Sequence, residues 1–225
     1  MMARRSVLGL MAAGASALLA GCGLSGNPSY RFKMTIEVDT PEGLKTGSSV
    51  YEVATVASSD MITGGKGSRF TLRGEAVALD LGGGRTLFAL LKTVAMSGHD
   101  NLGVSSMAAM DPAFDYDWMA STKKIASGDG IKSPAELPTK YYPMLVMFGD
   151  ISDPKSVEKV DPATIGMKRI TVEVTDESVT TGIAERLGVI GILPDRSLDN
   201  DFKTTTNPTL AQILGYKDFV RGTSK

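Results

Sequence analysis

RFKMTIEVD, residues 31–39, is the stretch that decides the fold class. Apolar and polar side chains alternate strictly along it, and the apolar set is Phe32, Met34, Ile36 and Val38. Successive side chains of a β-strand point to opposite faces of a sheet, so this alternation predicts a strand with one buried and one solvated face.

Further strand patterns lie on both sides of this stretch. Residues 50–57, 144–148 and 169–175 are rich in apolar and β-branched residues, and Pro41, Gly43 and Gly47 form a turn before residue 50. Sequential strands joined by short turns pair antiparallel. We therefore expect a β-dominated α+β fold of at least six strands, mainly antiparallel, as a sandwich or a partly open barrel with a few short helices.

Residues 69–94 predict a long bent hairpin. The apolar set shifts phase by one residue after Gly74, which is typical of a β-bulge. The glycines of residues 82–84 turn the chain, and residues 86–94 return as a nearly continuous apolar run. That run predicts a strand buried on both faces.

Short helices are predicted wherever a capping residue precedes proline or an apolar period of three to four. Asp111–Pro112 is expected to begin a helix that includes Phe114 and Trp118. A surface loop is expected around residues 98–103. The other predicted helical segments are brief turns at Asp153–Pro154 and Asp161–Pro162, residues 181–187, and residues 207–215.

The N-terminal segment has the layout of a secretory signal. Arg4 and Arg5 precede an apolar stretch over residues 7–20, which is too short to span a bilayer. The stretch ends in Leu19-Ala20-Gly21-Cys22, which resembles the lipobox of bacterial lipoproteins. The resemblance implies a signal peptide over 1–21 and lipid attachment to Cys22. It leaves a tether over 22–30 and a single β-rich domain over 31–225.

This N-terminal resemblance also implies a location. The chain would reach the cell envelope and bind a membrane through the lipid on Cys22. By resemblance to enteric lipoproteins, Gly23 in place of Asp favours the outer membrane over the inner one. Arg4-Arg5 followed by Val7 and Leu8 is similar to the twin-arginine export motif, so both export routes stay open. Cys22 is the only cysteine, which excludes an intramolecular disulfide.

Size and charge exclude one class of partner. Removal of residues 1–21 leaves 204 of the 225 residues, with 22 basic and 25 acidic side chains. No run rich in Lys and Arg is present, whereas binding to nucleic acid requires a basic face that neutralises phosphates. We therefore expect no nucleic-acid partner.

Three motifs suggest catalysis or nucleotide binding. Residues 77–84 are similar to the phosphate-binding hairpin of actin-like ATPases, but a glycine-rich hairpin turn explains them better. Ser121 and Lys124 fit the S-x-x-K motif of penicillin-binding proteins, and residues 45–47 fit their K-T-G motif in the wrong order. His99, the only histidine, precedes Asp100, and neighbours in sequence rarely form a catalytic pair.

The sequence offers few ligands for a metal or a cofactor. One histidine and one lipidated cysteine are too few for a zinc site, and we expect no cofactor. Asp195, Asp199 and Asp201 supply oxygens that calcium could use, although a solvated acidic turn is the simpler interpretation. A ligand cleft could be lined by Tyr116, Trp118, Tyr141 and Tyr142, but core and rim positions explain these aromatic residues better.

The segments 143–160, 170–176 and 179–183 look like a recurring pattern in uncharacterised proteobacterial envelope proteins, to which no activity is attached. The main hypothesis is therefore a non-catalytic lipoprotein that binds an envelope partner or stabilises an assembly. An envelope hydrolase and a carrier of a small apolar ligand are the alternatives.

Overall fold

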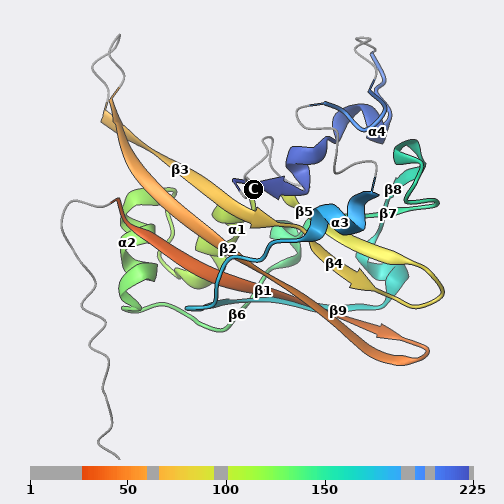
Figure 1. Ribbon diagram of the computed structural model, residues 1–225. Helices are drawn as coiled ribbons and strands as arrows, with labels where there is room; N and C mark the ends of the chain where they lie inside the picture. Colours follow the sequence, from red (N-terminus) through yellow and green to blue (C-terminus); the bar gives the residue numbers. More distant parts are fainter. Residues whose placement is uncertain (1–26, 60–65, 94–100, 189–195, 201–205, 223–225) are drawn as a thin grey trace, which may run out of the picture.

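The computed structural model describes residues 27–59, 66–93, 101–188, 196–200 and 206–222. Its strands form two open antiparallel sheets, with the orders β10-β3-β2-β1-β9-β6 and β4-β5-β7-β8 (Figure 1). The β-dominated α+β class is confirmed, and the described strands close no barrel. The strands are β1 (Ser29–Thr40), β2 (Gly43–Ser59), β3 (Lys66–Glu75), β4 (Val77–Asp80), β5 (Thr86–Thr93), β6 (Ala135–Glu136), β7 (Pro143–Phe148), β8 (Val157–Lys159), β9 (Met167–Val174) and β10 (Val220–Arg221).

Strand β1 lies inside the larger sheet, between β2 and β9. Its apolar residues, Phe32, Met34, Ile36 and Val38, have no exposed surface, whereas the polar residues between them are half-buried. The predicted alternation is therefore confirmed. Strands β2 and β9 pair with β1 in a register that places their apolar residues on the same face of the sheet. This face packs against the core.

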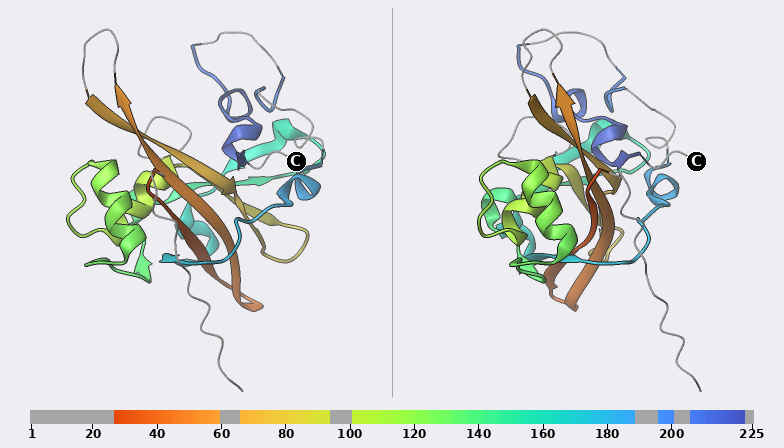
Figure 2. Two further views of the ribbon diagram at one scale, coloured as in Figure 1. Left: turned by 60° about the vertical axis from the view of Figure 1, so that its left-hand side comes forward. Right: turned by 90° about the vertical axis from the view of Figure 1, so that its left-hand side faces the viewer.

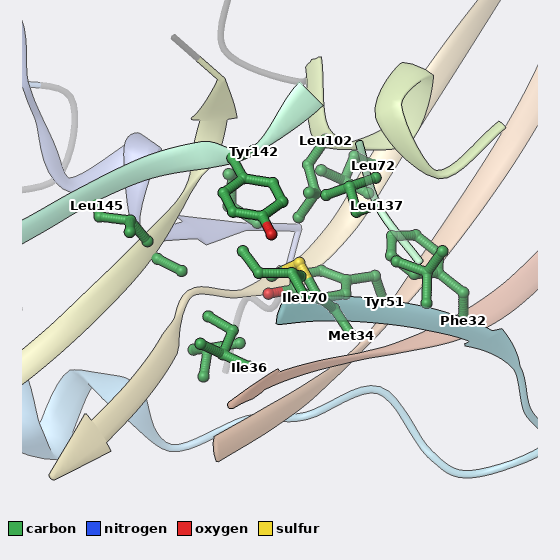
Figure 3. Packing of buried hydrophobic residues seen from close by; sticks show 14 of the residues in the cluster. Phe32, Met34, Ile36, Tyr51, Leu72, Leu102, Leu137, Tyr142, Leu145 and Ile170 are labelled. Atoms are coloured by element: carbon green, nitrogen blue, oxygen red, sulfur yellow. The ribbon is translucent and has the colours of Figure 1, made fainter. Parts of the chain in front are cut away.

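The main core fills the space between the two sheets. Residues from the larger sheet, including Met34 and Ile170, lie opposite Tyr142 and Leu145 on the smaller sheet's side (Figure 3). Strand β5 is buried on both faces, as its continuous apolar run predicts. The packing of two sheets face to face makes this half of the molecule a sandwich.

A sharp corner at Gly74 carries the chain from one sheet to the other. Gly74 has φ +145°, and a Cβ atom there would lie 2.5 Å from Cδ1 of Tyr51. Before the corner β3 pairs with β2, and after it β4 pairs with β5. The hairpin predicted over 69–94 is therefore correct only from Val77 onward. A phase slip at glycine fits a change of sheet as well as a bulge.

Two helices cover the larger sheet beyond the sandwich, on the face that also carries the core (Figure 2). They are α1 (Asn101–Met110) and α2 (Trp118–Ser127). Buried hydroxyl pairs join them to the sheet. Tyr30 Oη and Ser106 Oγ are 2.8 Å apart, and Thr55 Oγ1 and Thr122 Oγ1 are 2.7 Å apart.

Both helices differ from the prediction. Helix α1 begins where a surface loop was expected. Gly103 lets it approach the sheet closely, since a Cβ there would lie 3.0 Å from the Phe70 ring. Helix α2 is capped by Asp117, whose carboxylate accepts from the Ala120 amide, and not by Asp111. Asp111 instead caps a turn through the Ala113 amide.

An extended segment, residues 175–182, crosses the outer face of the larger sheet. The Lys33 ammonium lies 2.8 Å from the Glu177 carboxylate, and the Thr180 amide donates to the Val50 carbonyl. The segment leads into α3 (Ile183–Leu187). That helix, with α4 (Leu210–Ile213) and β10, packs a second apolar cluster that includes Phe88 and Phe219.

The remaining short elements agree with the prediction. Asp153 and Asp161 each cap a 3₁₀ turn, Pro154–Ser156 and Pro162–Ile165, and helices occur within 181–187 and 207–215. Further 3₁₀ turns of the described residues span Thr139–Tyr141 and Tyr216–Asp218. Among the described residues, no helix combines the length and the apolar character that crossing a membrane requires.

Candidate functional site

The S-x-x-K residues meet at a buried carboxylate. Ser121 Oγ donates to Asp111 Oδ2 at 2.8 Å, and Lys124 Nζ lies 2.6 Å from Asp111 Oδ1. Ser121 is only 2% exposed. The three side chains join the end of α1 to α2, and we call them the Asp111 clamp.

The electrostatics of the Asp111 clamp suit a structural role. Burial alone would raise the pKa of Asp111. Hydrogen bonds from Lys124, Ser121 and the Ala113 amide, together with the lysine charge, outweigh burial and hold the pKa of Asp111 below its ordinary value. A carboxylate with a lowered pKa is a weak base, so it is poorly suited to activate the Ser121 hydroxyl.

The K-T-G residues lie far from the Asp111 clamp. Residues 45–47 are on the sandwich half of β2, where a Cβ on Gly47 would lie 3.1 Å from Val77. Helix α2 contacts β2 at Thr55, through Thr122. Nine residues of strand separate Thr46 from Thr55, about 30 Å at ~3.3 Å per residue. The two motifs therefore do not assemble one catalytic site.

The glycine triplet forms the turn of the β4–β5 hairpin. Gly82, Gly83 and Gly84 all have positive φ, and Asp80 Oδ1 accepts from the Gly82 amide at 2.8 Å. The prediction of a hairpin turn is confirmed. The turn borders an open cleft of about 700 Å³ at the end of the smaller sheet. The cleft is lined by Asp80, Gly84, Thr86, Phe88, Phe148, Gly149, Asp150, Ile151 and Arg186.

This cleft combines an apolar floor with charged walls. The rings of Phe88 and Phe148 meet edge to face with centroids 5.8 Å apart. Asp150 accepts from the hydroxyl and the amide of Ser152, and these hydrogen bonds hold the pKa of Asp150 below its ordinary value. Arg186 Nη1 donates to the Ala78 carbonyl at 3.4 Å. The cleft can therefore hold a small amphipathic group.

The four aromatic residues proposed for a ligand cleft do not share one. Tyr116 is 60% exposed and, with Trp118, borders a hollow beside β2 and β3. Tyr142 is buried and borders a different hollow of about 460 Å³, lined mainly by apolar residues such as Leu145. Tyr141 packs against the main core. The four residues therefore line no common cleft, and Tyr141 and Tyr142 belong to the core, as expected of core and rim residues.

Several candidate residues lie outside the described part of the chain: Cys22, His99, Asp100, Asp195 and Asp201. Asp199 is described, and its carboxylate accepts from the Ser197 hydroxyl at 2.9 Å. Within the described residues, no group of three or more His, Cys, Asp or Glu side chains could hold a metal ion. Calcium binding at this loop therefore stays a prediction.

Comparisons of the chain with known proteins find no matching family model, curated protein or solved structure. The resemblances to lipoproteins and to proteobacterial envelope proteins therefore stay predictions.

Two features of the site were not predicted from sequence. Asp111 was expected to begin a helix, and nothing in its spacing from Ser121 identifies it as the partner of that side chain. The cleft brings together Phe148 and Arg186. These residues are far apart in the sequence and become neighbours only when the chain is folded. The proline after Asp111 signalled only a helix start.

Proposed function

We propose that this protein is a lipid-anchored binding module of the bacterial cell envelope that acts without catalysis. The lipobox before Cys22 supports the anchor. The observation that carries the non-catalytic role is the Asp111 clamp: the Ser121 hydroxyl is 2% exposed and donates to a carboxylate. A serine in that state is neither accessible to a substrate nor activated by Lys124.

The anchor would hold the folded domain near a bilayer. Strand β1 begins at Ser29, seven residues after Cys22. Seven residues reach at most about 25 Å when fully extended. A binding surface on the domain would therefore act close to the membrane, where one lipid anchor concentrates it.

Membrane fractionation tests the anchor. The full chain should fractionate with membranes and incorporate labelled palmitate, and Cys22→Ser should remove the label and release the protein. Ser25→Ala is the matched control, since it changes a small polar residue of the tether and leaves the lipobox intact. A Cys22→Ser protein that keeps its label would overturn the lipid anchor.

A serine-reactive probe tests the non-catalytic role. The protein should not be labelled by a fluorescent β-lactam or a fluorophosphonate, because Ser121 is buried and engaged. Labelling that Ser121→Ala abolishes and Ser127→Ala preserves would establish a reactive nucleophile. That result would favour the hydrolase.

A further inference from the structure

The two sheets protect nearly all of their edges. Strands β10 and β6 are two residues long, and β8 is three residues long and lies against α4. The guanidinium of Arg186 caps the Ala78 carbonyl on β4. Leu137 and Ser133 occupy backbone groups of Ile170 and Val174 along β9. Short or covered edges prevent unwanted strand pairing.

Strand β3 is different, because its outer edge is long and unpaired. Strand β10 pairs with β3 only at Gly74 and Glu75. On the opposite side, β2 pairs with β3 from Lys66 to Arg73. Within the described part of the chain, no strand lies along the outer edge between Gly67 and Arg73.

The hydrogen-bond pattern shows which groups face this edge. The Thr55 amide donates to Pro28, on the β1 side of β2, whereas the Val50 amide donates to Thr180 on the opposite side. The N–H and C=O groups of successive residues in a strand point to opposite sides, so those of the even-numbered residues of β2 point toward β3. Ala54 is opposite Thr71. Odd-numbered residues of β3 therefore bond to β2.

It follows that Ser68, Phe70 and Leu72 direct their amides and carbonyls outward. The pairing of Gly74 with Arg221 of β10 on the same edge agrees with this direction. No hydrogen bond among the described residues occupies these six groups. They span about 17 Å of strand, enough for five residues of an added strand.

The side chains around this edge select an acidic and apolar partner. Arg69 and Arg73 are exposed on one face of β3, and Arg73 is only loosely paired, 3.8 Å from Glu52. On the other face, the half-buried Phe70 ring packs edge to face on Trp118 at 5.1 Å. A neighbouring strand would be stabilised by carboxylates opposite the arginines and by apolar residues beside Phe70.

The same charges disfavour a second copy of this chain. Two β3 strands paired antiparallel about a two-fold axis would place Arg69 and Arg73 of one copy beside those of the other. Like charges on neighbouring strands destabilise the pairing. The occupant is therefore a different chain.

We propose that the outer edge of β3 binds an extended acidic segment of a partner protein by β-strand addition, with alternating carboxylate and apolar side chains. Backbone hydrogen bonds at Ser68, Phe70 and Leu72 would supply affinity, and the arginines would supply selectivity. This inference rests on the proposed binding role and is independent of the lipid anchor.

A peptide titration tests the proposal on the Cys22→Ser protein, residues 22–225. The probe is an octapeptide of alternating glutamate and valine, followed by amide NMR shifts and hydrogen exchange. The amides of Ser68, Phe70 and Leu72 should exchange fast in the free protein and slow at least tenfold with peptide. An octapeptide of alternating lysine and valine should bind at least tenfold more weakly.

Matched proline variants locate the binding edge. Ser68→Pro removes an outward amide and should weaken binding at least tenfold, whereas Ala57→Pro, on the opposite edge of the same hairpin, should not. Circular dichroism establishes that each variant is folded. Arg69→Glu with Arg73→Glu should reverse the preference between the two peptides, which tests the proposal even if Ser68→Pro does not fold.

Three results would overturn the proposal. Slow exchange at the three amides in the free monomer would mean that the edge is already covered. Concentration-dependent protection without peptide would identify a second copy as the occupant. Peptide binding that survives Ser68→Pro but not Ala57→Pro would place the site on β2. None of these results bears on the anchor, which fractionation tests separately.

Discussion

Strand β2 passes through two regions that stabilise it differently. In the sandwich half, Tyr51 and Val53 are fully buried, with β1 beside them and the main core above. Beyond Thr55 the strand continues with β3 as a two-stranded arm, which we define as residues 55–59 and 66–70 (Figure 1). Burial in the arm depends on contacts with helix α2, and among the arm residues whose burial is described only Thr55 is buried.

The difference indicates that the sandwich half provides stability and that the arm is suited to binding. The sandwich half gains its stability from side chains removed from water on two sides. The arm has fewer buried apolar contacts, so it belongs to the part of a protein that opens most readily. A region that binds an added strand has to keep backbone groups free, which costs stability. The arm is where this protein tolerates that cost.

The largest expected effect compares one phenylalanine from each region. Phe32→Ala removes a fully buried ring from the sandwich and should destabilise the protein by about 3–5 kcal/mol. Phe70→Ala removes a half-buried ring from the arm, and about half of that loss is expected. Urea unfolding of both variants measures the difference. Equal losses would show that the arm is as firmly packed as the sandwich.

The second prediction concerns the corner at Gly74, where the chain passes from the larger sheet to the smaller one. Gly74→Ala adds both a positive-φ penalty and a clash with Tyr51, so a loss on the order of 3 kcal/mol is expected. Gly43→Ala is the control, since Gly43 has φ +109° but no atom within 4 Å of the added Cβ. It should cost about 1 kcal/mol. Thermal unfolding of the two variants separates strain from clash, and similar costs would contradict the close approach to Tyr51.

The Asp111 clamp supplies the third prediction, because it holds the helices that support the arm. Asp111→Asn weakens the hydrogen bonds from Ser121 and Lys124 and should cost about 1–3 kcal/mol at pH 7. The pKa of Asp111 is lowered in the folded protein, so its stabilisation is complete above the ordinary carboxyl pKa, near 4. It is lost as the pH falls through the lower folded-state pKa.

Urea unfolding from pH 7 to pH 2 measures this effect. The gap between the wild-type protein and Asp111→Asn should narrow on acidification and should not widen. Asp117→Asn is the control, because it changes the helix cap and leaves the Asp111 clamp intact. A gap that is independent of pH would mean that Asp111 is not ionised in the folded protein.

Sequence periodicity predicted the strands of the sandwich better than the corner between its two sheets. The alternation of apolar and polar residues located β1, and a continuous apolar run located β5. A strand buried on one face needs apolar residues at alternate positions, and a strand buried on both faces needs them at every position. The corner at Gly74 was ambiguous, since a phase slip fits either a bulge or a change of sheet. Only the partner strands of β3 and β4 distinguish the two.

The helices and the Asp111 clamp depend on contacts that sequence does not display. Asn101 and Gly103 are poor helix formers, and Gly103 lets α1 pack closely against Phe70. The hydrogen bonds to Asp111 span 10 and 13 residues, which matches no helical or strand period. The same reasoning explains why the S-x-x-K residues were recognised as a motif while their actual partner was not.

The smallest effect compares two cross-strand pairs of the same chemistry. Glu37 lies opposite Arg169 in the sheet's interior, and Glu52 lies opposite Arg73, three residues before the arm. The first pair is 2.9 Å apart and the second 3.8 Å apart. Glu37 is also the more buried of the two glutamates, with 14% of its side chain exposed against 34% for Glu52. Its ion pair should therefore be less screened by water.

Double-mutant cycles with alanine at each position measure both couplings. The Glu37–Arg169 pair should show the larger coupling, and both should shrink as salt rises, because the charges are partly solvated. A weak Glu52–Arg73 coupling has a consequence for binding: it leaves Arg73 free to exchange its partner for a carboxylate on an added strand. If the Glu52–Arg73 coupling is instead the stronger one, an acidic peptide would have to displace Glu52. The selectivity assigned to the outer edge of β3 would then rest on Arg69 alone.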